Sequence, residues 1–116
     1  MFGSRVFIAL FSSVAAISTV NAYTGRASSD SLGTTPCPTQ CPLTDYRAAL
    51  PVDLFPNGEK CCSTVYVSYQ GVNIDVTFTD LFLAGAGSFN ISLSDKAFAE
   101  LAPLELGQIS PVVWNL

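Results

Sequence analysis

The stretch TVYVSYQGVNIDVTFTD, residues 64–80, carries the most regular pattern in this sequence of 116 residues. Apolar or aromatic residues recur at every second position on both sides of Gly71, at 65, 67 and 69 and then at 72, 74, 76 and 78. A period of two is typical of half-buried strands, and a glycine between two such runs indicates a turn. The stretch therefore predicts a β-hairpin and a mostly β fold built around it.

Upstream of the hairpin the pattern is weaker. Residues 47–55 group apolar side chains around Pro51, which predicts a short strand that ends at the turn Pro56–Glu59. Residues 23–42 are rich in Ser, Thr, Gly and Pro, so we expect an irregular segment there.

Downstream of the hairpin the sequence predicts one helix and one further strand. Ser94 is a favourable N-cap for a short helix from Asp95 to Leu101, because its side chain can accept a bond from the first turn. Ile109–Trp114 predicts a final strand, in which Pro111 indicates an edge position or a bulge. Short strands at this spacing, with one helix, indicate a small barrel or sandwich.

Residues 1–22 have the features of a secretory signal peptide. Arg5 precedes the apolar run Val6–Ile17, and Val20 and Ala22 occupy the two positions that determine cleavage. The run is shorter than the ~20 apolar residues that a membrane-spanning helix needs. We therefore expect cleavage after Ala22, a single domain over residues 23–116, and a secreted, extracellular protein with no membrane contact after cleavage.

The charge balance excludes several classes of function. Five Lys and Arg residues stand against nine Asp and Glu, for a net charge of −4, so the chain lacks the basic surface that holds a phosphate backbone. The absence of His excludes imidazole as a general base or metal ligand. We expect no nucleic-acid partner, no metal and no cofactor.

The four cysteines lie in two clusters, Cys37 with Cys41 and Cys61 with Cys62. An even number of cysteines in a small secreted domain indicates a disulfide framework. Because adjacent cysteines do not pair easily, we expect two bridges between the clusters, each contributing ~3 kcal/mol. The pairing stays open, and a zinc site with four thiolates is the alternative, although the spacing is not that of a zinc ribbon.

The order of several short motifs carries a specific resemblance to a known family. In sequence order these motifs are Gly25–Ser28, Val52–Phe55, Val76–Asp80, Asn90–Ser94, Ala97–Ala102, Gly107–Ile109 and Val113-Trp114. The order resembles that of the RlpA-like, expansin-like and barwin-related secreted proteins, over residues 24–116. The resemblance implies a mostly β fold, a six-stranded double-psi β-barrel with one short helix, stapled by disulfides.

The same resemblance implies a role at cell-wall polysaccharide. The family includes expansins, lytic transglycosylases, endoglucanases and chitin-binding barwins, and Asp80 matches the aspartate that is the general acid in its hydrolytic members. Glycoside cleavage usually requires a second carboxylate across the scissile bond. Asp30, near a position where relatives carry an aspartate, and Asp45 are the candidates for that partner.

Three departures from the family pattern argue against catalysis. Residues 80–84 lack the two cysteines that follow the aspartate in many relatives, Ser92–Ser94 replaces an Asp-Leu-Ser motif, and no His is present to form the expansin His-x-Asp pair. We therefore expect a monomeric, non-enzymatic barrel that binds or loosens cell-wall polysaccharide. The alternatives are a polysaccharide-cleaving enzyme with Asp80 as general acid, and a secreted effector scaffold that binds a protein.

Two further features concern the surface. Tyr46, Phe82 and Trp114 are candidates for a sugar-binding surface, with burial in the barrel as the alternative interpretation. Asn90-Ile91-Ser92 is an N-glycosylation sequon, and because it overlaps an expected strand, attachment of a glycan requires an exposed face.

Overall fold

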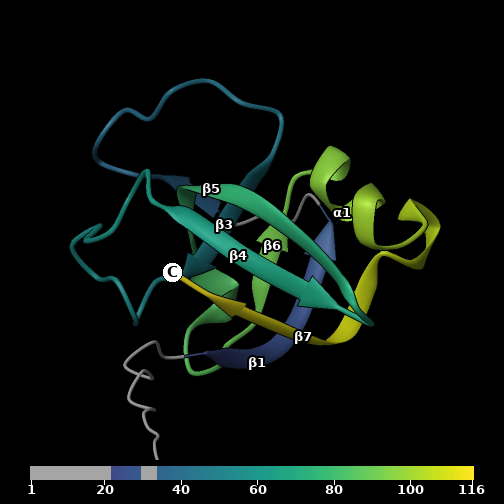
Figure 1. The fold of residues 1–116 in the computed structure, drawn as a ribbon. Helices are drawn as coiled ribbons and strands as arrows, with labels where there is room; N and C mark the ends of the chain where they lie inside the picture. Colours follow the sequence, from purple (N-terminus) through teal and green to yellow (C-terminus); the bar gives the residue numbers. More distant parts are fainter. Residues whose placement is uncertain (1–21, 30–33) are drawn as a thin grey trace, which may run out of the picture.

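The computed structural model describes residues 22–29 and 34–116 (Figure 1). The signal peptide predicted for residues 1–22 therefore lies outside the described residues except for Ala22, and so does Asp30. None of the helices formed by the described residues has the length and apolar character needed to cross a membrane.

Six strands close into a barrel. They are β1 (Tyr23–Ser29), β3 (Arg47–Pro51), β4 (Thr64–Tyr69), β5 (Val72–Phe82), β6 (Ile91–Leu93) and β7 (Gln108–Asn115). Bonded neighbours follow the order β5-β3-β6-β1-β7-β4, and β4 pairs again with β5, which closes the ring. The short β2 (Thr34–Pro36) pairs with β5 beside it. The predicted six-stranded barrel with one short helix is confirmed.

The predicted hairpin forms the wall from β4 to β5. Val65 is opposite Val76 and Val67 is opposite Ile74, as the period of two requires. The inward side chains of the two strands pack in one core with Trp114 from β7 and Phe98 from the helix. β5 continues to Phe82, beyond the end of the alternating pattern, because β3 and β2 also pair with its second half.

The expectation of an irregular segment over residues 23–42 is wrong for its first part, since Tyr23–Ser29 is β1, between β6 and β7. Its small residues are required by close packing. Ala27 is fully buried, and a Cβ at Gly25 would lie 2.3 Å from the carbonyl oxygen of Phe89. A composition that indicates a loop by local propensity is here the composition of a tightly packed barrel strand.

The helix and the last strand follow the sequence predictions with one difference each. Helix α1 (Asp95–Leu101) begins after Ser94, but the Ser94 hydroxyl donates to the carbonyl oxygen of Asp45 at 2.7 Å instead of capping the helix. β7 lies inside the closed ring, so Pro111 marks a bulge and not an edge: β7 carries an extra residue where β1 runs from Gly25 to Ala27. The described residues also form two short 3₁₀ turns, η2 (Leu83–Gly85) and η3 (Leu104–Leu106).

Both disulfides join the two cysteine clusters, as predicted. Cys37 pairs with Cys61 and Cys41 pairs with Cys62, which excludes the four-thiolate zinc site. The bridges fasten the long loop between β2 and β3 to the segment that precedes β4.

We predict that Gly25→Ala lowers the free energy of unfolding by about 2–3 kcal/mol, because the added methyl group overpacks β1 against the backbone at Phe89. Gly71→Ala is the matched control: its φ is +83° but nothing lies within 4 Å of its Cβ position, so we expect a loss of only about 1 kcal/mol. Urea unfolding measures both values, and equal losses would contradict the packing argument.

The bridge between Cys41 and Cys62 spans 21 residues, and its removal in the double variant Cys41→Ser/Cys62→Ser should lower the free energy of unfolding. The bridge between Cys37 and Cys61 still joins the two segments in the unfolded chain, so the variant releases only a short additional loop and we expect a loss of about 2 kcal/mol. Urea unfolding with the bridge between Cys37 and Cys61 intact provides the measurement. An unchanged midpoint would show that the loop is fixed by other contacts.

Candidate functional site

Asp80 reaches the outer face of the barrel because β5 carries a bulge beside it. Along the β3–β5 pair, Ala48 is opposite Phe78 but Ala49 is opposite Asp80, so Thr79 is an extra residue. Without it, Asp80 would share the inward face of Phe78, since side chains alternate along a strand. Asp80 instead shares the face of Ala49, a residue outside the core cluster.

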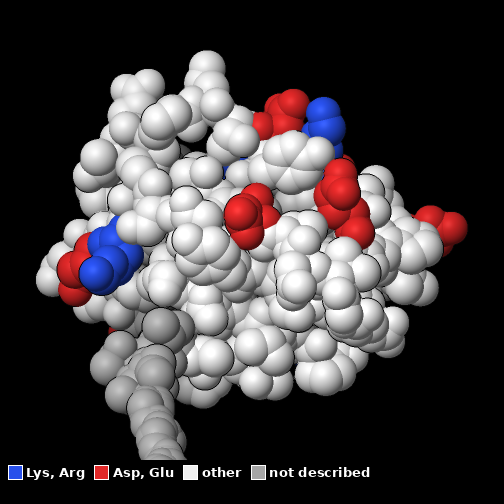
Figure 2. All heavy atoms as spheres, viewed as in Figure 1, with Lys and Arg blue, Asp and Glu red and all other residues white. Residues whose placement is uncertain are grey.

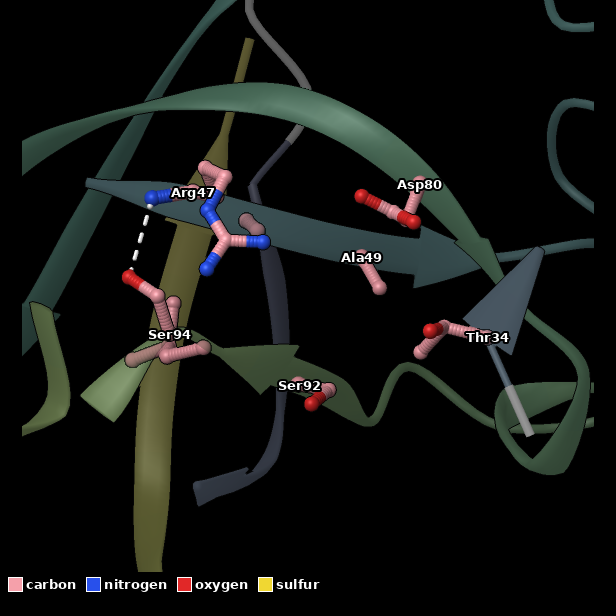
Figure 3. A pocket seen from close by; sticks show the side chains of 8 residues that line it. Thr34, Arg47, Ala49, Asp80, Ser92 and Ser94 are labelled. Atoms are coloured by element: carbon pink, nitrogen blue, oxygen red, sulfur yellow. Dashed lines mark hydrogen bonds between the residues drawn. The ribbon is translucent and has the colours of Figure 1, made fainter. Parts of the chain in front are cut away.

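The carboxylate of Asp80 opens into a hollow of about 50 Å³ on this outer face (Figure 3). The lining residues come from β2, β3, β5 and β6 and from the start of the helix: Thr34, Arg47, Ala48, Ala49, Asp80, Ser92, Leu93 and Ser94. The hydroxyl of Thr79 donates a 2.7 Å hydrogen bond to Oδ1 of Asp80, which fixes the carboxylate at the rim. Of the described lining residues, only Asp80 contributes a carboxylate to this hollow.

Arg47 links this hollow to the rest of the surface. It also lines a second hollow of about 660 Å³, beneath residues 36–45 of the long loop, and a third that ends at Lys96. We call the three together the Arg47 groove. Asp80 lines its first two parts, and Asp45 lines the second and third.

The position of Arg47 is fixed through its main chain. Its amide donates to the Ser94 hydroxyl at 3.1 Å, and its carbonyl oxygen accepts from the Ser94 amide at 2.9 Å. Figure 3 shows the guanidinium of Arg47 and the carboxylate of Asp80 over one face of β3. Ser92 lies on the neighbouring strand β6, and Thr34 lies on β2. The groove thus offers a cation on an anchored main chain, an anion held by the Thr79 hydroxyl, and several hydroxyl groups.

At the helix end of the groove the polar groups form pairs. Asp45 accepts an ion pair from Lys96 at 3.6 Å, and its side chain is 77% exposed. The phenol of Tyr46 donates to Oε2 of Glu100 at 3.1 Å, and this hydrogen bond raises the pKa of Tyr46, assisted by burial and the negative charge of Glu100. Asp45 is therefore a paired, solvated acid, and Tyr46 is held against the helix.

Two of the three predicted aromatic binding residues are not at the surface. Trp114 is fully buried and donates its indole N–H to the carbonyl oxygen of Phe89 at 2.8 Å, while Phe82 is only 6% exposed. This corrects the prediction that they line a sugar-binding surface, because neither ring has a face free to stack. Tyr46 is half-buried and packs against the core.

The remaining predicted site residues are Asp30 and Asn90. Asp30, the candidate partner of Asp80, lies outside the described residues. Asn90 directly precedes β6, and its Oδ1 accepts the amide of Arg26 at 2.9 Å, so its side chain has a structural partner; its glycosylation stays a prediction. Arg47 and Ser94 were not predicted as site residues. The position of Arg47 at the start of an expected strand, two residues after Asp45, is the sequence signal that could have indicated it.

Comparison with known proteins rests on structure, since no profile of a known protein family and no curated protein matches the sequence. The Streptomyces papain inhibitor is 28% identical, with a TM-score of 0.65 over 82% of this chain and 93% of that one. A mutant expansin of Clavibacter michiganensis in complex with cellohexaose is 20% identical, with a TM-score of 0.64 over 83% of this chain. The apo form of that expansin is 21% identical, with a TM-score of 0.65.

The chain spans about half the length of the expansin, 50% in both structures, and nearly the whole of the papain inhibitor. The match therefore places one barrel domain of the expansin on this chain. With the closed ring of six strands and the helix α1, these similarities show that the described part of the chain has the double-psi β-barrel fold seen in the papain inhibitor and the expansin.

Proposed function

We propose that this protein is a secreted, non-catalytic barrel that binds cell-wall polysaccharide in the Arg47 groove. The observation that carries the proposal is the outward turn of Asp80 at the β5 bulge, which places its carboxylate in one open groove with the guanidinium of Arg47. Secretion is supported by the predicted signal peptide and by two disulfides, which form in oxidising compartments.

The chemistry of the groove suits a hydroxyl-rich ligand. A guanidinium donates through five N–H groups and an ionised carboxylate accepts only, so Arg47 and Asp80 together satisfy both roles of sugar hydroxyls. The complex of the expansin with cellohexaose supports a glucan as the first ligand to test.

Binding is favoured over cleavage by the carboxylates. Hydrolysis usually employs two acids that face each other across the bond, whereas the described part of the hollow holds Asp80 alone. Of the two other acids of the groove, Asp45 forms an ion pair with Lys96, and Asp95 lines only the third hollow, which Asp80 does not line. A single acid positioned by Thr79 serves as a hydrogen-bond acceptor for a bound sugar.

We predict that Arg47→Ala weakens binding to the insoluble polymer that retains the wild type, among cellulose, chitin, β-glucan and peptidoglycan. Loss of a charged hydrogen-bond donor costs about 1.5–3 kcal/mol, so the dissociation constant should rise by about tenfold or more. Arg26→Ala is the matched control, because Arg26 is an exposed cation on β1 outside the groove. Failure of the wild type to bind any of the polymers would overturn the proposal.

A second pair of variants separates binding from catalysis. Asp80→Asn should weaken retention on the same polymer, while Asp75→Asn, an exposed acid on the same strand, should leave it unchanged. Soluble products released from the polymer are measured in parallel. We expect none from the wild type; release of product that Asp80→Asn abolishes would establish the enzymatic alternative instead.

A second candidate function is inhibition of a cysteine protease. It is favoured by the match to the Streptomyces papain inhibitor, which has the highest identity of the three structures compared and nearly the same extent as this chain. Purified wild-type protein should then slow hydrolysis of a peptide substrate by papain in a concentration-dependent manner. A serine protease such as trypsin is the control, and equal papain rates with and without the protein would exclude this function.

A further inference from the structure

The loop between β2 and β3 projects a surface that is uncharged over most of its length. It runs from the end of β2 at Pro36 to the start of β3 at Arg47 and rises from one end of the barrel in Figure 1; residues 36–44 carry no charge, and Asp45 follows them. In the same view, the atoms that project at the top left of Figure 2 are white, while one acidic and one basic cluster lie beside them at the upper right and the other charged side chains lie lower. The loop is therefore distinct from the acidic body of the protein.

Leu43 is the most exposed apolar residue of this loop. Its side chain is 99% exposed, whereas the other large exposed hydrophobic residues of the described chain are at most 56% exposed. Such a side chain makes almost no contact with its own protein, so its apolar surface contributes nothing to folding and is available to a partner.

The loop that carries Leu43 is anchored at several points. Cys37 and Cys41 are bonded to Cys61 and Cys62, and the amide of Cys37 donates to the carbonyl oxygen of Thr79 at 2.9 Å. Pro42 directly precedes Leu43 and fixes its own φ angle. A loop held in this way loses little conformational entropy when it binds, which favours affinity.

The chemistry of the loop suits a protein more than a polysaccharide. An aliphatic side chain has no flat face on which a sugar ring can stack, whereas it fits an apolar side-chain pocket. The absence of charge over residues 36–44 also suits a cleft in which charged groups would lose their hydration.

We propose that Leu43 is the anchor residue of a protein-binding loop, and that it enters an apolar side-chain pocket in the active-site cleft of a papain-class cysteine protease. Pro42 and Thr44 lie on either side of it as the adjoining peptide. This assignment rests on the protease inhibition proposed above and names the residue that performs it. Residues 42–44 also line the second hollow of the Arg47 groove, so a protease and a polysaccharide would contact adjoining surfaces.

The test compares the inhibition constants of wild type, Leu43→Ala and Leu43→Asp against papain. Truncation of a buried anchor should raise the constant by at least about tenfold, and a carboxylate in an apolar pocket should raise it further. Leu106→Ala is the matched control, since Leu106 is 56% exposed on η3 and lies away from the loop. Thermal unfolding of each variant establishes that all of them are folded.

The possible outcomes separate this inference from the function on which it rests. If the wild type does not inhibit papain, the proposed inhibition fails and the assignment of Leu43 fails with it. If the wild type and Leu43→Ala inhibit equally, inhibition stands and the assignment of Leu43 is overturned. A loss of inhibition in Leu43→Ala but not in Leu106→Ala supports the assignment.

Discussion

The structure depends on the pairing of β5 with strands on both of its edges. β4 bonds to its first half, β3 bonds to its second half on the other edge, and β2 adds to the last three residues. Closure of the barrel requires both pairings at once. The bulge at Thr79 lies close to the point where β5 stops pairing with β4 and pairs with β3. It reverses which side chains of β5 point inward, so that Phe78 fills the core and Asp80 faces outward.

Local sequence patterns were sufficient for the elements that are stabilised locally. The hairpin has a strict period of two, and the two cysteine clusters admit bridges only between them. The helix was placed correctly from Ser94 and its acidic first turn, although the Ser94 hydroxyl bonds to Asp45 and does not cap the helix. β1 was missed because its sequence, with Gly25 and three hydroxyl residues, resembles a loop. The constraint that selects it, the close approach of Phe89, comes from a residue 64 positions away in sequence and leaves no local signal.

The site was predicted in part for the same reason. Asp80 was identified from a family motif, and the structure places it in an open groove. Arg47 was missed because the groove is assembled from the ends of β3, β5 and β6 and from the long loop, which are adjacent only after the ring closes. Trp114 was misassigned because an aromatic residue in a strand has the same sequence signature whether its ring faces the core or the solvent.

The two adjacent bridges at Cys61 and Cys62 have a consequence for the evolution of this protein. They separate the residues that maintain the fold from the loop residues between Cys37 and Cys41 and just after Cys41, whose side chains are largely exposed to solvent. Substitutions at positions such as 39, 40 and 43 therefore carry little penalty in stability. A lineage can change the sequence that this loop displays, and with it the molecule that is recognised, while the barrel beneath remains constant.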